Sequence, residues 1–366
     1  MSEDVILVIV VATALAFDFT NGFHDTANVV ATSISTKAMS PRLAVGFAAI
    51  LNFVGAFISL EVAATVANDV VEGGAITPTV VFAGLIGAIA WNLLTWWFGL
   101  PSSSSHALIG GVVGAVIAAV GTGAVLGDGV LGKVLIPALL APTVAFVAGV
   151  ITINIAYGVT GRERPGPVTR GFRLGQIVSG GLLALAHGTN DAQKTMGVIT
   201  LALIANGTLA EDAGVPFWVV VSAATAIALG TYTGGWRIIR TMGTRIIKMD
   251  SAQGFSAQGA GAATILASTH FGFPLSTTHV ITGGVMGAGA GKRVSAVRWG
   301  LAGNILVAWL LTLPAAAAIG AAAYGFTSLF GDGAAGPVIV SLLSLGGVAA
   351  IFIHRARQGS PVPATG

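Results

Sequence analysis

Two short stretches, one in each half of the chain, decide how this sequence folds. Residues 20–28 read TNGFHDTAN, and residues 186–194 read AHGTNDAQK. In both stretches a glycine precedes an aspartate by three residues, which aligns Asp25 with Asp191. Each aspartate lies inside a long apolar run, where a carboxylate is unexpected. Its position at the same point of both halves indicates an internal repeat.

A second pair of motifs follows in the same order. Residues 101–106 read PSSSSH, and residues 274–279 read PLSTTH. Each is followed by a similar glycine-containing run, LIGGVVG at 108–114 and ITGGVMG at 281–287. The chain is therefore built from two related halves, each with an acidic motif and then a Pro-Ser motif.

The composition indicates a membrane protein. Of the 366 residues, 54% are hydrophobic and only 8% are charged, with a mean hydropathy of +0.88, whereas a soluble domain carries about 25% charged residues. The chain has no cysteine, which excludes disulfides and thiolate chemistry. Its net charge of +3 comes from basic residues in short loops. Such loops are topology signals rather than a nucleic-acid surface.

Long apolar stretches approach the roughly 20 residues that a helix needs to cross a bilayer. We therefore predict an all-α polytopic protein of the plasma membrane, embedded in the lipid bilayer, with about eleven (10–12) membrane segments. The segments are expected at residues 5–36, 43–66, 78–99, 106–126, 133–158, 174–205, 216–239, 254–272, 275–290, 296–325 and 335–353.

One loop divides the chain near its middle. Residues 161–173 hold two prolines and four arginines, the composition of a cytoplasmic linker. We therefore expect an N-terminal repeat at 1–160 and a C-terminal repeat at 174–325. An extra terminal helix and tail occupy 326–366.

The charged loops alternate in sign along the chain. Acidic loops include Asp69 with Glu72 and Glu211 with Asp212, whereas the central loop is basic. Because basic loops stay in the cytoplasm, we expect the N-terminus outside and the C-terminus in the cytoplasm. The first acidic motif then runs inward and its copy runs outward. The same order in reversed orientation is an inverted-topology repeat, typical of secondary transporters.

Asp25 and Asp191 are the expected cation or proton sites. An aspartate at the centre of a membrane helix costs about 2.5–3.5 kcal/mol on insertion scales, and both halves place this costly residue at the same point. Neighbouring Gly, Thr and Asn residues favour unwound backbone, as in a broken helix. A structural role as caps of broken helices is the alternative. Further coupling residues are expected among Asn21, His24, Asn28 and Asn190.

Two histidines are either proton carriers or packed hydrogen-bonding residues, namely His24 and His187. Lys194 stands three residues after Asp191, where the first half has Asn28. It either neutralises Asp191 or supplies positive charge to an anionic substrate. The sequence leaves both questions open.

The Pro-Ser motifs are expected at re-entrant tips, because each leads directly into an apolar helix. Hydroxyls together with the free N–H groups of a helix N-terminus suit an anion, and a role as helix N-caps is compatible with that. The expected anion-binding residues are Ser103, Ser104, Ser105, Ser276, Thr277 and Thr278, together with Thr26, Gln193 and Lys194 from the acidic motifs.

The paired motifs together resemble the inorganic phosphate transporter family, in particular its bacterial low-affinity branch. The resemblance covers almost the whole chain. It implies phosphate uptake by cation symport through an inverted-repeat core with helical hairpins, with no cofactor and with phosphate carried free or as a divalent metal complex. A homodimer is a further expectation.

The resemblance favours H⁺ as the coupling ion. Members with the sodium-type signature carry Gly-Ala-Asn-Asp-Val-Ala-Asn in both halves. Here His24 replaces the first asparagine of that pattern, and Gln193-Lys194 replace its final Ala-Asn in the second copy. Asp25 and Asp191 bind Na⁺ only if the protein is sodium-coupled.

Three alternatives stand beside phosphate symport. A permease for sulfate or another oxyanion is implied by a relative within the same family. An anion channel is the second alternative, and an intramembrane serine hydrolase is the third. The hydrolase requires a pairing such as Ser105 with His106, or Ser276 with His270. Symmetric duplication of these serines argues against it, so the sequence predicts a transporter and not an enzyme.

Overall fold

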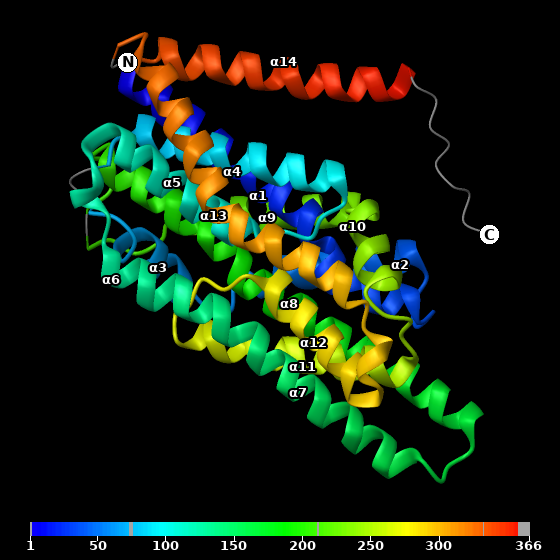
Figure 1. The fold of residues 1–366 in the computed structure, drawn as a ribbon. Helices are drawn as coiled ribbons and strands as arrows, with labels where there is room; N and C mark the ends of the chain where they lie inside the picture. Colours follow the sequence, from blue (N-terminus) through cyan, green and yellow to red (C-terminus); the bar gives the residue numbers. More distant parts are fainter. Residues whose placement is uncertain (1, 73–75, 211, 332, 358–366) are drawn as a thin grey trace.

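The computed structural model describes residues 2–72, 76–210, 212–331 and 333–357, which are almost entirely helical (Figure 1). Within these ranges, strand-like pairing is limited to one isolated bridge between Val71 and Val125. The all-α prediction is confirmed. Glu211 of the second acidic loop and the end of the tail at 358–366 lie outside the described residues.

The two halves have the same order of elements. The first half contains α1 (Ser2–Ser35), α2 (Pro41–Gly55), α3 (Glu61–Asn68), α4 (Pro78–Phe98), α5 (Ser104–Val120), α6 (Gly127–Gly129) and α7 (Ile136–Thr160). The second half contains α8 (Pro165–Ala205), α9 (Phe217–Thr233), α10 (Trp236–Arg240), α11 (Ser251–His270), α12 (Thr277–Lys292) and α13 (Trp299–Ser328), followed by α14 (Ala335–Arg357). Each half is thus a long helix, a broken pair, a hairpin and a closing long helix.

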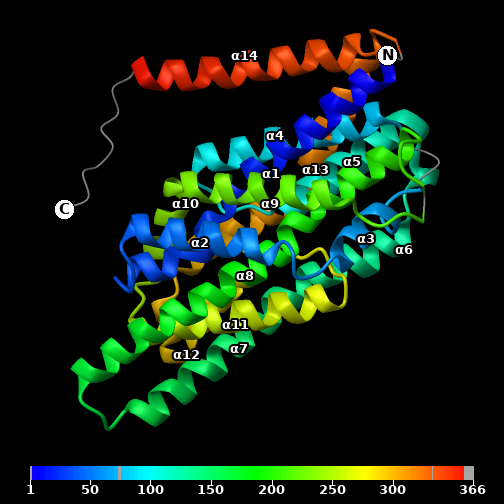
Figure 2. The ribbon, with the colours of Figure 1, turned by 180° about the vertical axis from the view of Figure 1, so that it is seen from behind.

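The halves are interleaved rather than side by side. Helix α1 packs against α9, and α8 packs against α2. The hairpin helix α5 packs against α13 of the other half, and α12 packs against α7. In both views α7, α8, α11 and α12 form one side of the molecule, and α1, α4, α5 and α13 form the other (Figures 1 and 2). The two long helices α1 and α8 contact each other between these sides.

The unwound backbone predicted around the two aspartates is wrong, because α1 and α8 are continuous helices through both motifs. The motif glycines serve helix packing instead. A Cβ on Gly22 would overlap the Ile227 carbonyl oxygen of α9, and a Cβ on Gly188 would overlap the Asn52 carbonyl oxygen of α2. Small residues permit such close approach between membrane helices.

Near the polar motifs, the non-helical backbone lies at the hairpin tips. Gly99 ends α4 and Gly272 follows α11, both with positive φ, at 66° and 70°, a conformation that glycine adopts without a Cβ penalty. Ser103 and Ser276 then cap the next helices by accepting hydrogen bonds from the backbone N–H groups of His106 and His279. The tip residues are buried inside the protein.

Three predicted boundaries differ from the structure. The linker predicted at 161–173 is shorter, since α8 already begins at Pro165, a residue suited to a first helical turn. The predicted segment 43–66 is divided between α2 and α3. The predicted segment 216–239 bends by 59° between α9 and the helix that continues to Arg245.

Four described helical stretches are long and apolar enough to cross a bilayer alone. They are residues 4–35, 78–98, 127–160 and 299–328, and the bent pair at 217–245 adds a fifth. Other predicted segments are shorter apolar helices, or carry many polar residues, as α8 does. The number of crossings, predicted as eleven, therefore remains a prediction.

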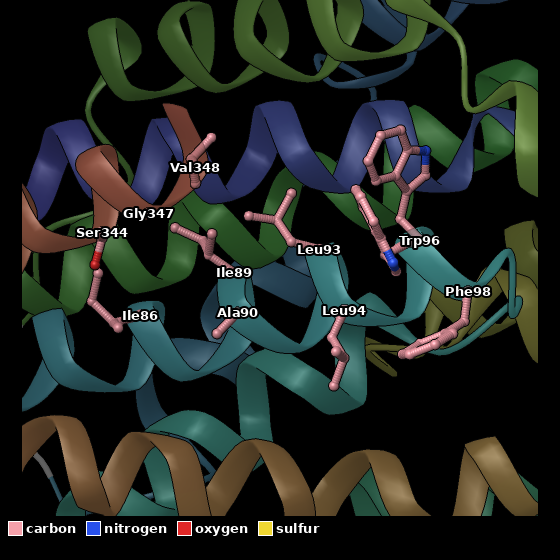
Figure 3. A pocket seen from close by; sticks show the side chains of 11 residues that line it. Ile86, Ile89, Ala90, Leu93, Leu94, Trp96, Phe98, Ser344, Gly347 and Val348 are labelled. Atoms are coloured by element: carbon pink, nitrogen blue, oxygen red, sulfur yellow. The ribbon is translucent and has the colours of Figure 1, made fainter. Parts of the chain in front are cut away.

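Helix α14 extends across one end of the bundle, away from most other helices (Figure 1). Between it and α4 lies a cavity of about 490 Å³. Its lining is apolar, with Ile86, Leu93 and Trp96 on one wall and Val348 on the other (Figure 3). The lining contains none of the predicted site residues, so this cavity is not the site.

The glycine contacts generate a first prediction. Gly22→Ala adds only a methyl group, and we expect it to lower the thermal unfolding midpoint in detergent, because overpacking costs about 1–3 kcal/mol. Gly46→Ala in α2 is the matched control, since nothing lies within 4 Å of the added Cβ. An unchanged midpoint for Gly22→Ala would contradict the packing role.

Candidate functional site

The predicted site residues meet where α1 and α8 contact each other beside the tips of both hairpins. Each of them is at most 3% exposed. The acidic motifs come from the middle of the long helices, and the hydroxyl residues come from the first turns of α5 and α12. The fold therefore brings four segments, far apart in the chain, to one buried polar centre.

Asp25 receives hydrogen bonds from both halves. Ser104 of its own half donates to Oδ2 at 2.7 Å, and Thr278 of the other half donates to Oδ1 at 3.2 Å. His24 Nδ1 lies 2.7 Å from the same Oδ1. The Asn28 amide donates to Thr278 at 2.8 Å. The carboxylate is thus held by two hydroxyls and one imidazole.

Asp191 has a related set of partners and one cation. Thr277 of its own half donates to Oδ2 at 3.3 Å. Lys194 donates to Oδ1 at 2.5 Å and to the Ser105 hydroxyl of the other half, also at 2.5 Å. Both residues of the Asp191–Lys194 pair are almost fully buried.

The two sets of contacts correspond to each other. Ser104 and Thr277 are aligned in the Pro-Ser motifs, and each donates to the aspartate of its own half. Asn28 and Lys194 are aligned in the acidic motifs, and each reaches the hydroxyl at the next position of the opposite hairpin. The main difference is chemical, an amide in one half and an ammonium in the other.

Three groups lie close enough to share a cation. Three ligand atoms lie within 4.8 Å of one another, one each from Asp25, His187 and Asp191. His187 Nε2 is 3.2 Å from Asp191 Oδ2, an electrostatic contact that lacks hydrogen-bond alignment. Its Nδ1 is 3.2 Å from Asn52 Oδ1. Carboxylate oxygens suit hard cations such as Na⁺, and the imidazole adds a proton acceptor.

Charge at this centre is negative when both carboxylates are ionised. Asp25 and Asp191 contribute two negative charges and Lys194 one positive charge, which leaves one net negative charge with neutral histidines. A buried charge without compensation is costly. The centre therefore attracts a proton or metal cation and, without one, repels an anion.

Some predicted residues have other partners. Gln193 Oε1 accepts from the backbone N–H groups of Val62 at 2.8 Å and Ala63 at 3.2 Å, which caps α3. Thr26 donates to the Gly22 carbonyl oxygen at 2.6 Å, and the Thr231 carbonyl oxygen lies 3.2 Å from the same hydroxyl. The structure thus directs both side chains to backbone groups rather than to the hairpin hydroxyls.

Asn190 and Asn21 also turn away from the aspartate pair. The Asn190 amide donates to Thr269 at 2.8 Å and to the Phe273 carbonyl oxygen at 3.1 Å, which fixes the second hairpin. Asn21 makes no side-chain hydrogen bond. One polar residue that sequence reasoning missed lies beside it, namely Asp18, which is fully buried. Its signal was an acidic residue within an apolar segment, but without a counterpart in the second half.

The serine–histidine pairs considered for hydrolysis are not formed among the described residues. Ser105 donates to the Leu275 carbonyl oxygen at 2.8 Å, and the Ser276 hydroxyl caps a helix. Ser102 lies 3.4 Å from His24 Nε2, but its proton goes to Thr95 at 2.7 Å. These hydroxyls thus donate to a carbonyl or to another hydroxyl, or cap a helix, rather than acting as activated nucleophiles.

Comparison with known proteins gives consistent results. A model of the phosphate transporter family matches residues 21–169 and 159–320. A protein of Mycobacterium leprae described as a probable low-affinity inorganic phosphate transporter is 55% identical over 355 residues, which are 96% of this chain and 85% of the relative. Relatives of the same description from Rhizobium meliloti and Bacillus subtilis are 50% and 46% identical, each over 87% of this chain and 96% of the relative.

A solved structure described as the sodium-dependent phosphate transporter has the same fold. It matches with a TM-score of 0.80 at 24% identity, over 88% of this chain and 99% of that one. At this identity the match shows the fold alone. The family model and the relatives cover most of the chain and carry the assignment. The chain is a multi-pass membrane protein that belongs to the phosphate transporter family.

Proposed function

We propose that the protein imports inorganic phosphate by symport with a cation. The observation that carries the proposal is that the hydroxyls at the hairpin tips donate directly to the two buried aspartates, Ser104 to Asp25 and Thr277 to Asp191. The groups suited to an anion and the groups suited to a cation therefore share the same hydrogen bonds. The names of the relatives, which refer to inorganic phosphate, support phosphate over sulfate as the substrate.

The hairpin tips supply the anion chemistry. Helices α5 and α12 both begin at the polar centre, and a helix N-terminus carries a partial positive charge and unpaired N–H groups. Ser104, Ser105, Thr277 and Thr278 add four hydroxyl donors there. The N–H groups and hydroxyls of two convergent helix N-termini could each donate a hydrogen bond to one of the phosphate oxygen atoms.

Shared hydroxyls supply the coupling. A hydroxyl has one proton to donate, so Ser104 cannot donate to the Asp25 carboxylate and to phosphate at once. When a proton or Na⁺ binds the aspartates, their negative charge is compensated, and the hydroxyls become free to turn toward phosphate. Without the cation, phosphate would compete with the carboxylates for the hydroxyl protons, and the negative charge of the carboxylates would repel it.

The membrane potential makes such coupling necessary. Moving one negative charge inward against an inside-negative potential costs about 2.3 kcal/mol per 100 mV. A phosphate dianion therefore faces about 4.6 kcal/mol at that potential. Co-transported cations remove this cost, and two carboxylates next to the anion site provide the places to carry them.

Alternating access fits an inverted-topology repeat. The equal order of elements in the two halves and the exchange of packing partners, α5 on α13 and α12 on α7, support such a repeat. The basic central loop favours a cytoplasmic side there, with the N-terminus outside and the C-terminus inside. The site is enclosed on all sides, so the account requires movement of the hairpins to open it to either side.

H⁺ is the favoured coupling ion. His24 lies against Asp25 and His187 against Asp191, so each carboxylate has a neighbouring imidazole, a side chain that can both donate and accept a proton. Na⁺ is the second candidate, supported by the oxygen ligands of the two aspartates. Phosphate carried as a divalent metal complex is compatible with either ion, because the complex lowers the charge to be moved.

The aspartates generate the second prediction. In proteoliposomes of the purified protein, an imposed cation gradient should drive radiolabelled phosphate above its equilibrium level. Asp25→Asn and Asp191→Asn should each reduce this concentrative uptake by at least tenfold, because an amide carries no charge to exchange and tenfold needs only about 1.4 kcal/mol. Separate pH and Na⁺ gradients identify the ion, and excess sulfate tests substrate choice.

Asp128→Asn is the matched control, because Asp128 is exposed and remote in sequence from both motifs. It should retain full uptake. Concentrative uptake that survives in both site variants would sink the proposal. Phosphate flux down its own gradient that needs no cation would instead indicate an anion channel.

Lys194 holds the centre together. Its ammonium has three protons, and all three are donated, to Asp191 Oδ1, to Ser105 Oγ and to the Leu275 carbonyl oxygen. No donor is left for phosphate unless one of these partners is released. We therefore propose that Lys194 neutralises Asp191 and joins the two hairpin tips, rather than binding phosphate directly.

This role predicts a double-mutant result. Lys194→Met leaves Asp191 buried without its cation, and breaking a buried ion pair costs about 3–5 kcal/mol. Its thermal unfolding midpoint in detergent should fall well below that of the control Lys248→Met, an exposed site. The double variant Asp191→Asn with Lys194→Met should be more stable than Lys194→Met alone. If the midpoint of the double variant fell by the sum of the losses in the two single variants, Lys194 would not neutralise Asp191.

A further inference from the structure

One buried carboxyl group has no part in the site described above. Asp18 lies in α1 with no exposed surface, and neither of its oxygen atoms has a hydrogen-bond partner. The side chains next to it are those of Asn21 and Thr195. Neither the Asn21 amide nor the Thr195 hydroxyl has a hydrogen-bond partner either. Three polar side chains from α1 and α8 thus lie together and buried, near one another but outside hydrogen-bond geometry.

The charged groups that act on Asp18 do not neutralise it. They are Asp191 and Lys194, one of each sign. Lys194 donates all three of its protons to other partners, as shown above. Asp18 therefore lacks a counter-ion within the site. A buried carboxylate in this situation requires a bound proton or a metal cation.

The repeat does not require these residues. With Asp25 aligned to Asp191, Asp18 aligns with Ala184, and Thr195 aligns with Val29. A polar group needed only to build the repeated fold would be expected in both halves. Asn21 aligns with His187, which is also polar, so the asymmetry lies in Asp18 and Thr195. A function specific to one side of the membrane accounts for these two residues better.

The cluster lies toward one end of the central site. Asp18 precedes Asp25 by seven residues, about 10 Å along a helix, and Thr195 follows Asp191 by four, about 6 Å. Asp18 is displaced toward the start of α1, and Thr195 is displaced toward the end of α8. These two helix ends lie near each other, so both residues lie on the same side of the aspartate pair. With the N-terminus outside, this is the outer side of the aspartate pair.

We propose that Asp18, Asn21 and Thr195 form a second site for a monovalent cation, either a proton or Na⁺, on the outer side of the central aspartates. The carboxylate supplies the charge, and the amide and hydroxyl oxygens supply neutral ligands or accept a proton. The cation bound there is co-transported with phosphate. This inference rests on the proposed symport, to which it adds a cation site beyond the central aspartates.

The experiment measures how many cations move with each phosphate. In proteoliposomes, a fixed phosphate gradient is balanced against an imposed cation gradient until net flux stops, and the balance point gives the ratio. Asp18→Asn should lower the cation-to-phosphate ratio by one while phosphate exchange across the membrane continues. One arm uses a pH gradient without Na⁺ and the other a Na⁺ gradient at equal pH, so the arm that changes identifies the ion.

Thr195→Val provides an independent test, since it removes only a hydroxyl. It should raise the cation concentration needed for half-maximal uptake by about tenfold, the effect of one lost hydrogen bond to a charged group. Thr200→Val is the matched control, a buried hydroxyl of the same helix that also has no hydrogen-bond partner. It should leave the cation dependence unchanged.

The outcomes separate the two proposals. If the unaltered protein fails to concentrate phosphate with either gradient, the proposed symport is wrong. If it concentrates phosphate but Asp18→Asn keeps the same ratio, the second cation site is wrong and the symport stands. If Asp18→Asn does not fold, Thr195→Val decides, and a cation dependence equal to that of Thr200→Val overturns the second site.

Discussion

The arrangement of the protein depends on hydrogen bonds from hairpin hydroxyls to two carboxylates buried in an apolar surrounding. Asp25 and Asp191 lie within 4.8 Å of a common histidine, and two ionised carboxylates so close are unfavourable unless donors or cations hold them. Ser104 and Thr277 provide donors from helix N-termini. The tip of each hairpin must therefore reach the middle of a long helix, α1 or α8. This requirement accounts for the packing of each half against helices of the other.

The two halves meet this constraint with different chemistry. In the second half, Lys194 compensates Asp191 with a fixed positive charge. In the first half the equivalent residue is Asn28, which carries no charge, and Asp25 is held by two hydroxyls and the His24 ring. The first carboxylate is therefore the one that depends more on a mobile cation. On this account the asymmetry, rather than the repeat itself, decides which carboxylate depends on the coupling ion.

Much of the centre could be predicted because it is duplicated. The acidic and Pro-Ser motifs occur twice in the same order, so their convergence followed from the sequence, and the hydrogen bonds of Ser104, Thr277 and Lys194 agree with it. The continuity of α1 and α8 could not be predicted, since glycine fits both an unwound turn and a tight helix contact. Which one Gly22 serves depends on α9, some two hundred residues away.

Other residues escaped prediction for similar reasons. The partners of Gln193 are backbone groups of α3, which no local pattern reveals. The repeat gives no signal for Asp18, because the aligned residue in the second half is Ala184. Reversed orientation of the halves rests on loop charges and packing, and it remains part of the proposal.

The central claim is that cation binding at the aspartates makes the anion site available. Equilibrium binding of radiolabelled phosphate to the detergent-purified protein tests it most directly, at a series of pH values and Na⁺ concentrations. Because coupling between two ligands is reciprocal, the account predicts that phosphate affinity rises with the concentration of the coupling ion, and that this rise is lost in Asp25→Asn. A phosphate affinity that is independent of both pH and Na⁺ would contradict it.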